Sequence, residues 1–289
     1  MSGNLRTTLE MIKWEHSIFA LPFALTGAML AANGVPRWSV LFWIVVCMVA
    51  ARSAAMAFNR LVDADIDMAN PRTASRAIPA GLLSRGFTTG FIVIVAVIFI
   101  FGASRLNRLT LELSPLVLAI VFSYSYTKRF TRWSHLVLGL ALGIAPAAAW
   151  IAVRGSLDLR IILLTGAVLF WVGGFDVLYA CQDFEHDRKV GLHSIPQAFG
   201  LKIAFWMARI MHIVMLALLA AVIAVFHLGG ISIAGVVAVA AMLIYEHSLI
   251  SPCDLKRMNA AFFTMNGIIS FVFNTALLAL MVNIAASAI

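Results

Sequence analysis

The sequence predicts an all-α protein that crosses a membrane nine times, and three observations support this fold class. The chain of 289 residues is 62% hydrophobic and 12% charged, whereas soluble domains are about 45–50% apolar and about 25% charged. Continuous apolar runs such as 159–180 and 205–226 are long enough to cross a hydrocarbon core of about 30 Å. Basic residues also gather in alternate loops. A soluble globule is therefore excluded, and so is an outer-membrane barrel, whose strands alternate polar and apolar residues.

Each predicted span is an apolar run between polar breaks. In chain order the nine runs are 15–34, 38–62, 87–104, 109–126, 135–153, 160–182, 203–226, 229–250 and 260–286. The fourth run is the weakest, because Glu112 and the pair Ser114-Pro115 lie near one of its ends. We expect residues 1–289 to form a single domain.

The distribution of basic residues predicts the orientation in the membrane. Of the 21 lysines and arginines, 14 lie in the N-terminal segment and in the loops after the second, fourth, sixth and eighth runs, and 5 lie in the opposite loops. Positively charged loops stay on the cytoplasmic side, so we expect a multi-pass inner-membrane protein with a cytoplasmic N-terminus. This bias accounts for the formal net charge of +8 without a nucleic-acid partner. The other two, Arg52 and Arg209, lie inside spans, where each either lines a cavity or pairs structurally.

Two of the predicted cytoplasmic loops resemble each other. Residues 58–86 read FNRLVDADIDMANPRTASRAIPAGLLSRG, and residues 175–200 read FDVLYACQDFEHDRKVGLHSIPQAFG. Each loop leaves an apolar helix through a D-x-x-x-D pair, passes basic residues, and then reaches Ile-Pro and a glycine. We therefore expect these two loops to have the same local structure, four spans apart in the sequence.

The aspartates of these loops fall on shared helix faces. The spacing i, i+4, i+8 places three side chains on one face of the second span: Asn59, Asp63 and Asp67. The same arithmetic places on one face of the sixth span Asp176, Tyr179, Asp183 and Asp187. Carboxylates at membrane depth are costly unless something compensates them, and Mg²⁺ usually binds through one or two carboxylates together with substrate phosphates. The two helix ends therefore predict a site for a metal-chelated diphosphate.

The basic residues nearby have two interpretations. Arg72 and Arg76 are either ordinary positive-inside charges or groups that bind phosphate oxygens, which the planar guanidinium suits. Lys128 and Arg129, which follow Tyr124-Ser-Tyr, are open to the same two interpretations.

The two motifs, N-x-x-x-D-x-x-x-D at 59–67 and D-x-x-x-D at 183–187, resemble the Asp-rich signatures of the UbiA superfamily of intramembrane prenyltransferases. Segments 70–79, 124–129 and 191–200 also look like loops of this family. The stretch 245–266 is similar to the bacterial 4-hydroxybenzoate polyprenyltransferase-like branch. One departure is that Glu185 and His186 stand where many members carry acidic pairs, which leaves the D-x-x-x-D frame intact.

The resemblance implies nine helices around a central cavity that holds Mg²⁺ and a polyprenyl diphosphate. It suggests as metal ligands Asp63, Asp67, Asp183 and Asp187. It suggests as diphosphate contacts Asn59, Arg72, Arg76, Lys128 and Arg129. It places Asp176 and Tyr179 deeper in the cavity, where, together with Asp183, they are the candidate catalytic residues.

The expected reaction is Mg²⁺-dependent transfer of a polyprenyl group to an aromatic acceptor, with release of diphosphate. The predicted acceptor is 4-hydroxybenzoate or a similar quinone precursor. Breaking the allylic C–O bond leaves a carbocation, which apolar helices keep from water. The expected surroundings are membrane lipid, and no protein partner is implied. Polar residues near the last two spans either bind the acceptor or cap helices: Glu246, His247, Asn259 and Asn266.

Other functions compete with this interpretation. A naphthoate-type menaquinone precursor is the alternative acceptor. A solute transporter is the alternative from another class, although transport sites lie near the membrane midplane and these carboxylates cluster at one side. A CDP-alcohol phosphotransferase is disfavoured, because residues 57–62 contain neither the D-G nor the spaced A-R of its signature.

Overall fold

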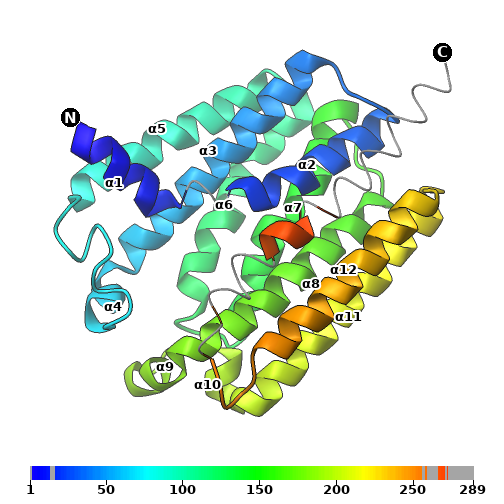
Figure 1. Cartoon of the computed structure of the whole chain (residues 1–289). Coiled ribbons are helices and arrows are strands. Elements are labelled where there is room, and N and C mark those ends of the chain that lie inside the picture. Colours follow the sequence, from blue (N-terminus) through cyan, green and yellow to red (C-terminus); the bar gives the residue numbers. More distant parts are fainter. Residues whose placement is uncertain (1, 14–16, 256–257, 259–265, 271, 273–289) are drawn as a thin grey trace.

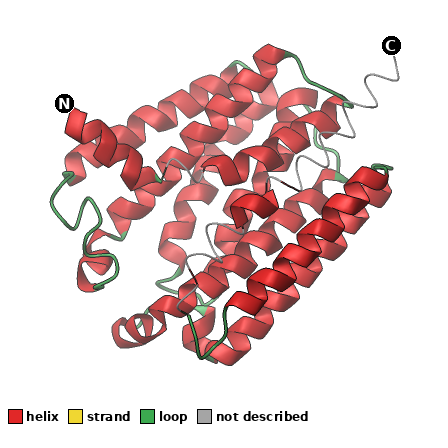
Figure 2. Ribbon diagram, viewed as in Figure 1, coloured by secondary structure: helices red, strands yellow, loops and turns green. Residues whose placement is uncertain are grey.

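The computed structural model of the chain describes residues 2–13, 17–255, 258, 266–270 and 272. Every regular element in these residues is a helix (Figure 1), and the ribbon contains no strand there (Figure 2). In chain order the elements are α1 (Ser2–Ile12), α2 (Ser17–Ala32), α3 (Trp38–Val62), α4 (Ala64–Ala69), α5 (Arg85–Ser104), α6 (Arg108–Thr127), α7 (Ser134–Arg154), α8 (Ile161–Ala180), the 3₁₀ turn η2 (Cys181–Asp183), α9 (Phe184–Val190), α10 (Ile195–Phe199), α11 (Leu201–Val225) and α12 (Gly230–Leu249).

Seven stretches of helix are long and apolar enough to cross a membrane: α3, α5, α6, α7, the stretch from α8 through α9, α11 and α12. The second to eighth predicted spans coincide with α3, α5, α6, α7, α8, α11 and α12 to within two residues at either end, although the crossing stretch that contains α8 continues through α9 to Val190. The first predicted span corresponds to α2, whose 16 residues are fewer than the about 20 that a full crossing needs. Apart from 266–270 and 272, the ninth predicted span, 260–286, lies outside the described residues.

Helices α7 and α8 pack closely because glycine lies where their backbones meet. A Cβ atom on Gly139 of α7 would come within 2.3 Å of the Leu169 carbonyl oxygen of α8. A Cβ atom on Gly27 of α2 would lie equally close, at 2.3 Å, to the Pro146 carbonyl oxygen of α7. Small residues of this kind let membrane helices approach each other. The contacts hold α8, which leads into the second Asp-rich segment, firmly against α7.

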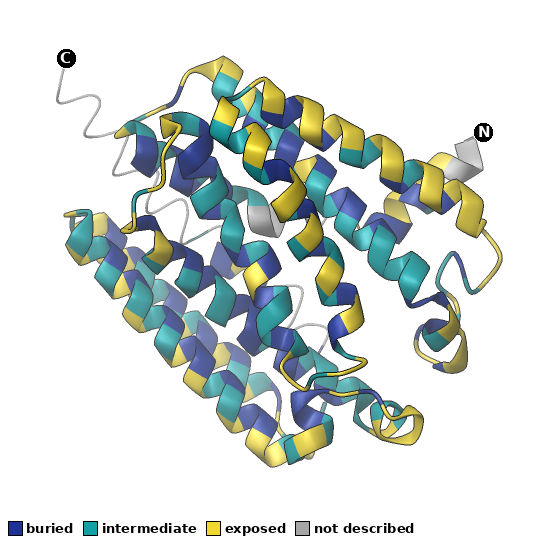
Figure 3. Ribbon diagram, turned by 180° about the vertical axis from the view of Figure 1, so that it is seen from behind, coloured by how far each residue is buried: buried dark blue, intermediate teal, exposed yellow. Residues whose placement is uncertain are grey.

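The long helices are apolar on both their inner and outer sides. Inside, Trp171 of α8 is fully buried and packs on Phe23 with ring centroids 5.1 Å apart. Outside, α5 exposes Val93, Ile94 and Val97, and the outward sides of the helices are generally the exposed ones (Figure 3). An apolar outer surface is what helices in contact with lipid require.

The N-terminal helix α1 was not among the predicted spans. It is short, it carries an ion pair between Arg6 and Glu10 at 2.9 Å, and it buries Met11 and Ile12 in a cluster with Ala57 and Ile78. Helix α1 therefore lies over the first Asp-rich segment. This segment and the second one, around α9 and α10, lie at the same end of the bundle (Figure 1).

The two Asp-rich segments share a backbone feature. Helix α3 ends at Val62, and Asp63 (φ −89°, ψ 1°) stands between α3 and α4. Asp183 (φ −97°, ψ 5°) ends η2 and stands before α9 in nearly the same conformation. In the first segment the i, i+4 bonds continue through this point, since the backbone N–H of Asp63 donates to Asn59 at 2.9 Å. The first aspartate of each D-x-x-x-D pair thus marks a bend between two helices.

Candidate active site

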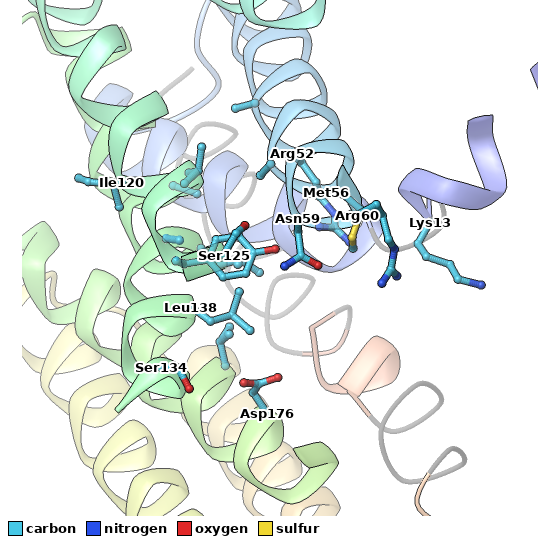
Figure 4. A pocket seen from close by; sticks show the side chains of 18 of the residues that line it. Lys13, Arg52, Met56, Asn59, Arg60, Ile120, Ser125, Ser134, Leu138 and Asp176 are labelled. Carbon is cyan, nitrogen blue, oxygen red and sulfur yellow. The ribbon is translucent and has the colours of Figure 1, made fainter. Parts of the chain in front are cut away.

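A cavity of about 1030 Å³ opens between the helices at the end where the Asp-rich segments meet. Arg52, Asn59 and Arg60 of α3 project into it from one wall, and Asp176 of α8 projects from the facing wall (Figure 4). Other parts of its lining are apolar: Phe99, Leu106, Leu113, Val117, Ile120 and Val121. The cavity therefore combines a charged part with an apolar part.

The first segment contributes Asp63 and Asp67, both buried. Asp63 accepts hydrogen bonds from Nδ2 of Asn59 at 2.9 Å and from Nζ of Lys128 at 2.6 Å. Its other oxygen, Oδ1, is buried without a hydrogen bond and lies 3.5 Å from Nη2 of Arg129. Asp67 accepts from Nη1 of Arg76, 2.7 Å from each of its oxygens.

The second segment contributes Asp183, which is tied directly to the first. Arg72 donates through Nε to Oδ1 of Asp183 at 2.8 Å and through Nη2 to Oδ2. Asn70 donates to the same Oδ1 at 3.1 Å, and Nη1 of Arg72 donates to the Tyr179 hydroxyl at 3.1 Å. Burial acts to lower the pKa of Arg72, but the hydrogen bonds and charge of Asp183 outweigh it and raise that pKa.

Asp187 is held differently from the other three carboxylates. It lines the cavity and accepts a hydrogen bond from Oγ of Ser194 at 3.2 Å. It is the one carboxylate of the four to which the described residues supply no ion pair. The structure thus brings the four predicted metal ligands to one cavity, and three of them pair with cations from the predicted diphosphate set.

The carboxylates suit a divalent cation that arrives with phosphate. Among the described residues, no three side chains of His, Cys, Asp or Glu lie close enough to hold an ion by themselves. Mg²⁺, however, usually takes one or two carboxylates and completes its shell with substrate phosphates. Two aspartate pairs on one cavity, with Oδ1 of Asp63 buried and lacking a hydrogen bond, provide such a donor set.

Asp176 lies deeper along α8 and binds a residue that the sequence patterns did not single out. Its Oδ2 lies 2.7 Å from Nδ1 of His135, in the first turn of α7. The backbone N–H of Ile195 lies 3.3 Å from the other ring nitrogen, Nε2. His135 is buried and lines the cavity. The available signal was a histidine at the start of an apolar run, which by itself does not identify its partner.

Arg52 is the second polar group deep in the cavity. It lies in the middle of α3, three turns before its end, and its Nε is buried with no hydrogen-bond partner in the described chain. Of the two interpretations given to Arg52, lining a cavity is therefore the one confirmed.

Several singled-out residues lie away from the cavity. Arg129 donates to the Val62 carbonyl at 2.8 Å and stacks on Tyr126 instead of lining the cavity. Arg209 stacks on Trp206, with its guanidinium 5.0 Å from the ring centroid. The polar residues near the last spans are also outside the lining: Glu246 is buried, His247 pairs with His212 at 2.9 Å, and Asn266 accepts from Trp171 at 2.9 Å. Asn259 lies outside the described residues.

Known proteins match this chain over most of its length. The model of the UbiA prenyltransferase family matches residues 20–268. A 4-hydroxybenzoate octaprenyltransferase of Aliivibrio fischeri (strain MJ11) is 30% identical over 257 residues and covers 89% of each chain. One from Vibrio cholerae is 32% identical over 251 residues, which cover 84% of this chain and 87% of the relative.

Solved structures match the fold as well. The apo structure of a UbiA homolog from Aeropyrum pernix K1 is 32% identical, with a TM-score of 0.84 over 92% of this chain and 98% of that chain. A UbiA homolog from Archaeoglobus fulgidus bound to DMAPP and Mg²⁺ is 19% identical, with a TM-score of 0.74 over 96% and 99% of the two chains.

Proposed function

This chain belongs to the UbiA prenyltransferase family, and we propose that it transfers a polyprenyl group from a polyprenyl diphosphate to 4-hydroxybenzoate or a similar aromatic quinone precursor, releasing diphosphate. The observation that carries the proposal is one cavity with four aspartates in its charged part and apolar walls elsewhere. The names of the relatives support both substrates. We also propose that residues 1–289 act as one domain.

We propose that Mg²⁺ enters with the diphosphate and is held by Asp63, Asp67, Asp183 and Asp187. The formal charges of the lining support this. Six lining residues are basic and six are acidic: Lys13, Arg52, Arg60, Arg72, Arg76 and Lys128 against Glu10, Asp63, Asp67, Asp176, Asp183 and Asp187. A prenyl diphosphate carries several negative charges, so a formally neutral lining offers it no net attraction and added cations are needed. When bound, Mg²⁺ supplies Lewis-acid stabilisation of the leaving diphosphate.

The basic side chains beside the aspartates are our candidates for binding the diphosphate itself. Arg72, Arg76 and Lys128 each form an ion pair with one of the carboxylates. Their N–H groups are donors that would stabilise the charge developing on the leaving group. Asn59, which projects into the cavity (Figure 4), completes this set. Tyr179 keeps Arg72 in place through its hydroxyl. Arg129 does not line the cavity, and we assign it to holding Asp63 and the end of α3.

The acceptor is proposed to bind deeper, between Arg52 and Asp176. The buried Nε of Arg52 is a charge-assisted donor suited to a carboxylate such as that of 4-hydroxybenzoate. The apolar lining excludes water from the allylic carbocation, which would otherwise be hydrolysed. The bilayer is proposed to be the inner membrane, with the aspartates on its cytoplasmic side, because 14 of the 21 basic residues belong to the N-terminal segment and to the segments between spans on that side.

The test uses purified protein in detergent with geranyl diphosphate, Mg²⁺ and radiolabelled 4-hydroxybenzoate, and counts label in the lipid extract. We expect transfer of label that EDTA abolishes and added Mg²⁺ restores. D63A and D183A should abolish transfer. D65A is the matched control, because Asp65 belongs to the same segment but pairs with Arg85 and does not line the cavity.

The outcomes separate the parts of the proposal. Transfer only to a naphthoate-type acceptor would replace the acceptor and keep the reaction. Full activity of D63A or D183A would refute the site. No transfer to any aromatic acceptor, with the protein folded, would refute the function and favour the transporter interpretation.

A further inference from the structure

The side chains of His135 and Asp176 form a hydrogen-bonded pair whose direction is set by the backbone of Ile195. The backbone N–H of Ile195 points at Nε2 of the ring, 3.3 Å away. A backbone N–H can only donate, so Nε2 is the acceptor, and the ring proton is assigned to Nδ1. Nδ1 then donates to Oδ2 of Asp176 at 2.7 Å.

The contacts of Asp176 differ from those of the other aspartates in the cavity. The carboxylates of Asp63, Asp67 and Asp183 are each paired with an arginine or lysine, so their oxygens are already engaged by cations. Among the described residues, the one hydrogen-bond partner that the structure gives the Asp176 carboxylate is Nδ1 of His135, at Oδ2. Asp176 faces the cavity (Figure 4), with Oδ1 available to a bound molecule.

The position of Asp176 along α8 suits contact with the acceptor ring rather than with the diphosphate. It precedes Asp183 by seven residues, which is about 10 Å along a helix axis. Arg52, the candidate group for the acceptor carboxylate, projects into the same cavity from the facing helix (Figure 4). The Asp176 carboxylate therefore lies on the apolar side of the aspartate cluster.

The histidine is also connected to the second Asp-rich segment. Ser194 caps α10 and donates to Oδ2 of Asp187 at 3.2 Å, while the next residue, Ile195, donates to His135. Both residues are buried. Two adjacent residues at the start of α10 thus contact Asp187 directly and Asp176 through His135.

We propose that Asp176 is the base that removes the ring proton of the acceptor and that His135 is the positioning residue that orients it; this rests on the proposed function. The acceptor ring supplies an electron pair to the allylic carbon, and the C–O bond breaks with its electron pair leaving on diphosphate. The attacked ring carbon then carries both the prenyl group and its hydrogen. Asp176 takes that hydrogen as a proton, and the C–H electron pair restores aromaticity. The Nδ1–H of His135 holds Oδ2 so that Oδ1 faces the proton.

The test compares rates with 4-hydroxybenzoate and with its ring-dideuterated form, deuterated at both carbons next to the hydroxyl-bearing carbon. The variants are D176N, H135N and H135Q, measured with geranyl diphosphate and Mg²⁺ in detergent. H135N keeps an amide donor near the place of Nδ1, whereas H135Q moves its amide to the place of Nε2. The matched control is H212Q, because His212 is also buried and bonded to a side chain but does not line the cavity.

We expect D176N to lower kcat by about 10²-fold or more, since general base catalysis contributes at least this much. Its KM for geranyl diphosphate should be unchanged, and an isotope effect on kcat should appear because proton loss becomes slow. H135Q should lower kcat by about tenfold, as expected for loss of a hydrogen bond to a charged group, and should show the same isotope effect. H135N should restore most of the rate, and H212Q should show no isotope effect.

Contrary results have distinct meanings. Wild-type kcat in D176N, or a slow H135Q with no isotope effect, would overturn the roles given to Asp176 and His135 while the proposed function stands. Absence of prenylated product from the wild type would refute the proposed function first, and this inference with it. D176N keeps the side-chain volume, so it carries the test if the histidine variants do not fold.

Discussion

Replacing Arg72 by alanine should loosen the loop after α4 from α8, because this side chain connects the two. It donates twice to the carboxylate of Asp183 and once to the Tyr179 hydroxyl. The Arg72 side chain is 32% exposed and that of Asp183 is 18% exposed, so water screens the pair only in part. The contact is therefore expected to stabilise the loop measurably.

The magnitude follows from the kind of bond and its exposure. Hydrogen bonds to charged groups contribute about 1.5–3 kcal/mol, and partial exposure places this contact in the lower half, at about 2 kcal/mol. At about 1.4 kcal/mol per factor of ten, R72A should increase the population of the opened loop about 30-fold. Arg85 offers the matched control. Its pair with Asp65 also involves one arginine and one aspartate, at 2.5 Å, but the side chains are 55% and 75% exposed.

Hydrogen exchange of residues 70–84, measured by mass spectrometry in detergent, reports this opening. The amides of Thr73 and Ala74 are held by the Asn70 carbonyl at 2.9 Å and become exchangeable when the loop opens. We expect about 30-fold faster exchange in R72A and less than about fivefold in R85A, since an exposed pair is worth at most about 1 kcal/mol. Equal rates in R72A and the wild type, or equal acceleration in both variants, would refute the reasoning.

Two further predictions concern packing and acceptor binding. G139A should lower the free energy of unfolding by about 1–3 kcal/mol, because its Cβ would lie 2.3 Å from the Leu169 carbonyl oxygen. G90A, whose Cβ would meet nothing within 4 Å, should raise the free energy of unfolding by about 0.5–1 kcal/mol. Thermal unfolding in detergent measures both variants, and a change of the same sign in both would contradict the prediction. R52Q should raise KM for 4-hydroxybenzoate by about 10- to 100-fold through loss of a charge-assisted hydrogen bond, and KM for geranyl diphosphate should be unchanged. Steady-state kinetics with each substrate varied in turn measures both constants. An equal rise in both KM values would contradict the assignment of Arg52 to the acceptor.

The membrane helices were predictable because a bilayer imposes a length on each apolar run. Spans such as 38–62 could be bounded from hydropathy alone, and α3 begins and ends at these residues. Helix α1 escaped the same method, because residues 2–12 include Arg6 and Glu10 and bury only part of their surface. Its stability comes from packing against the first Asp-rich segment, and hydropathy contains no term for such a contact.

The aspartates could be grouped from their spacing, but their partners could not. The i, i+4 rule brings Asp63 beside Asn59, and the structure joins the two at 2.9 Å. Arg72 and Asp183, by contrast, are separated by 111 residues, and only the packing of α3 and α8 into one bundle brings them together. The pair of His135 and Asp176 depends in the same way on the close approach of α7 and α8 at glycine.

Arg129 shows how neighbouring residues with the same charge acquire different tasks. Lys128 and Arg129 directly follow Thr127, the last residue of α6, and of the two only Lys128 lines the cavity. Arg129 instead donates to the carbonyl of Val62, the last residue of α3. The guanidinium also lies 3.5 Å from Oδ1 of Asp63. Arg129 therefore contacts both the end of α3 and the buried carboxylate that follows it, and this places it beside the site as a structural residue.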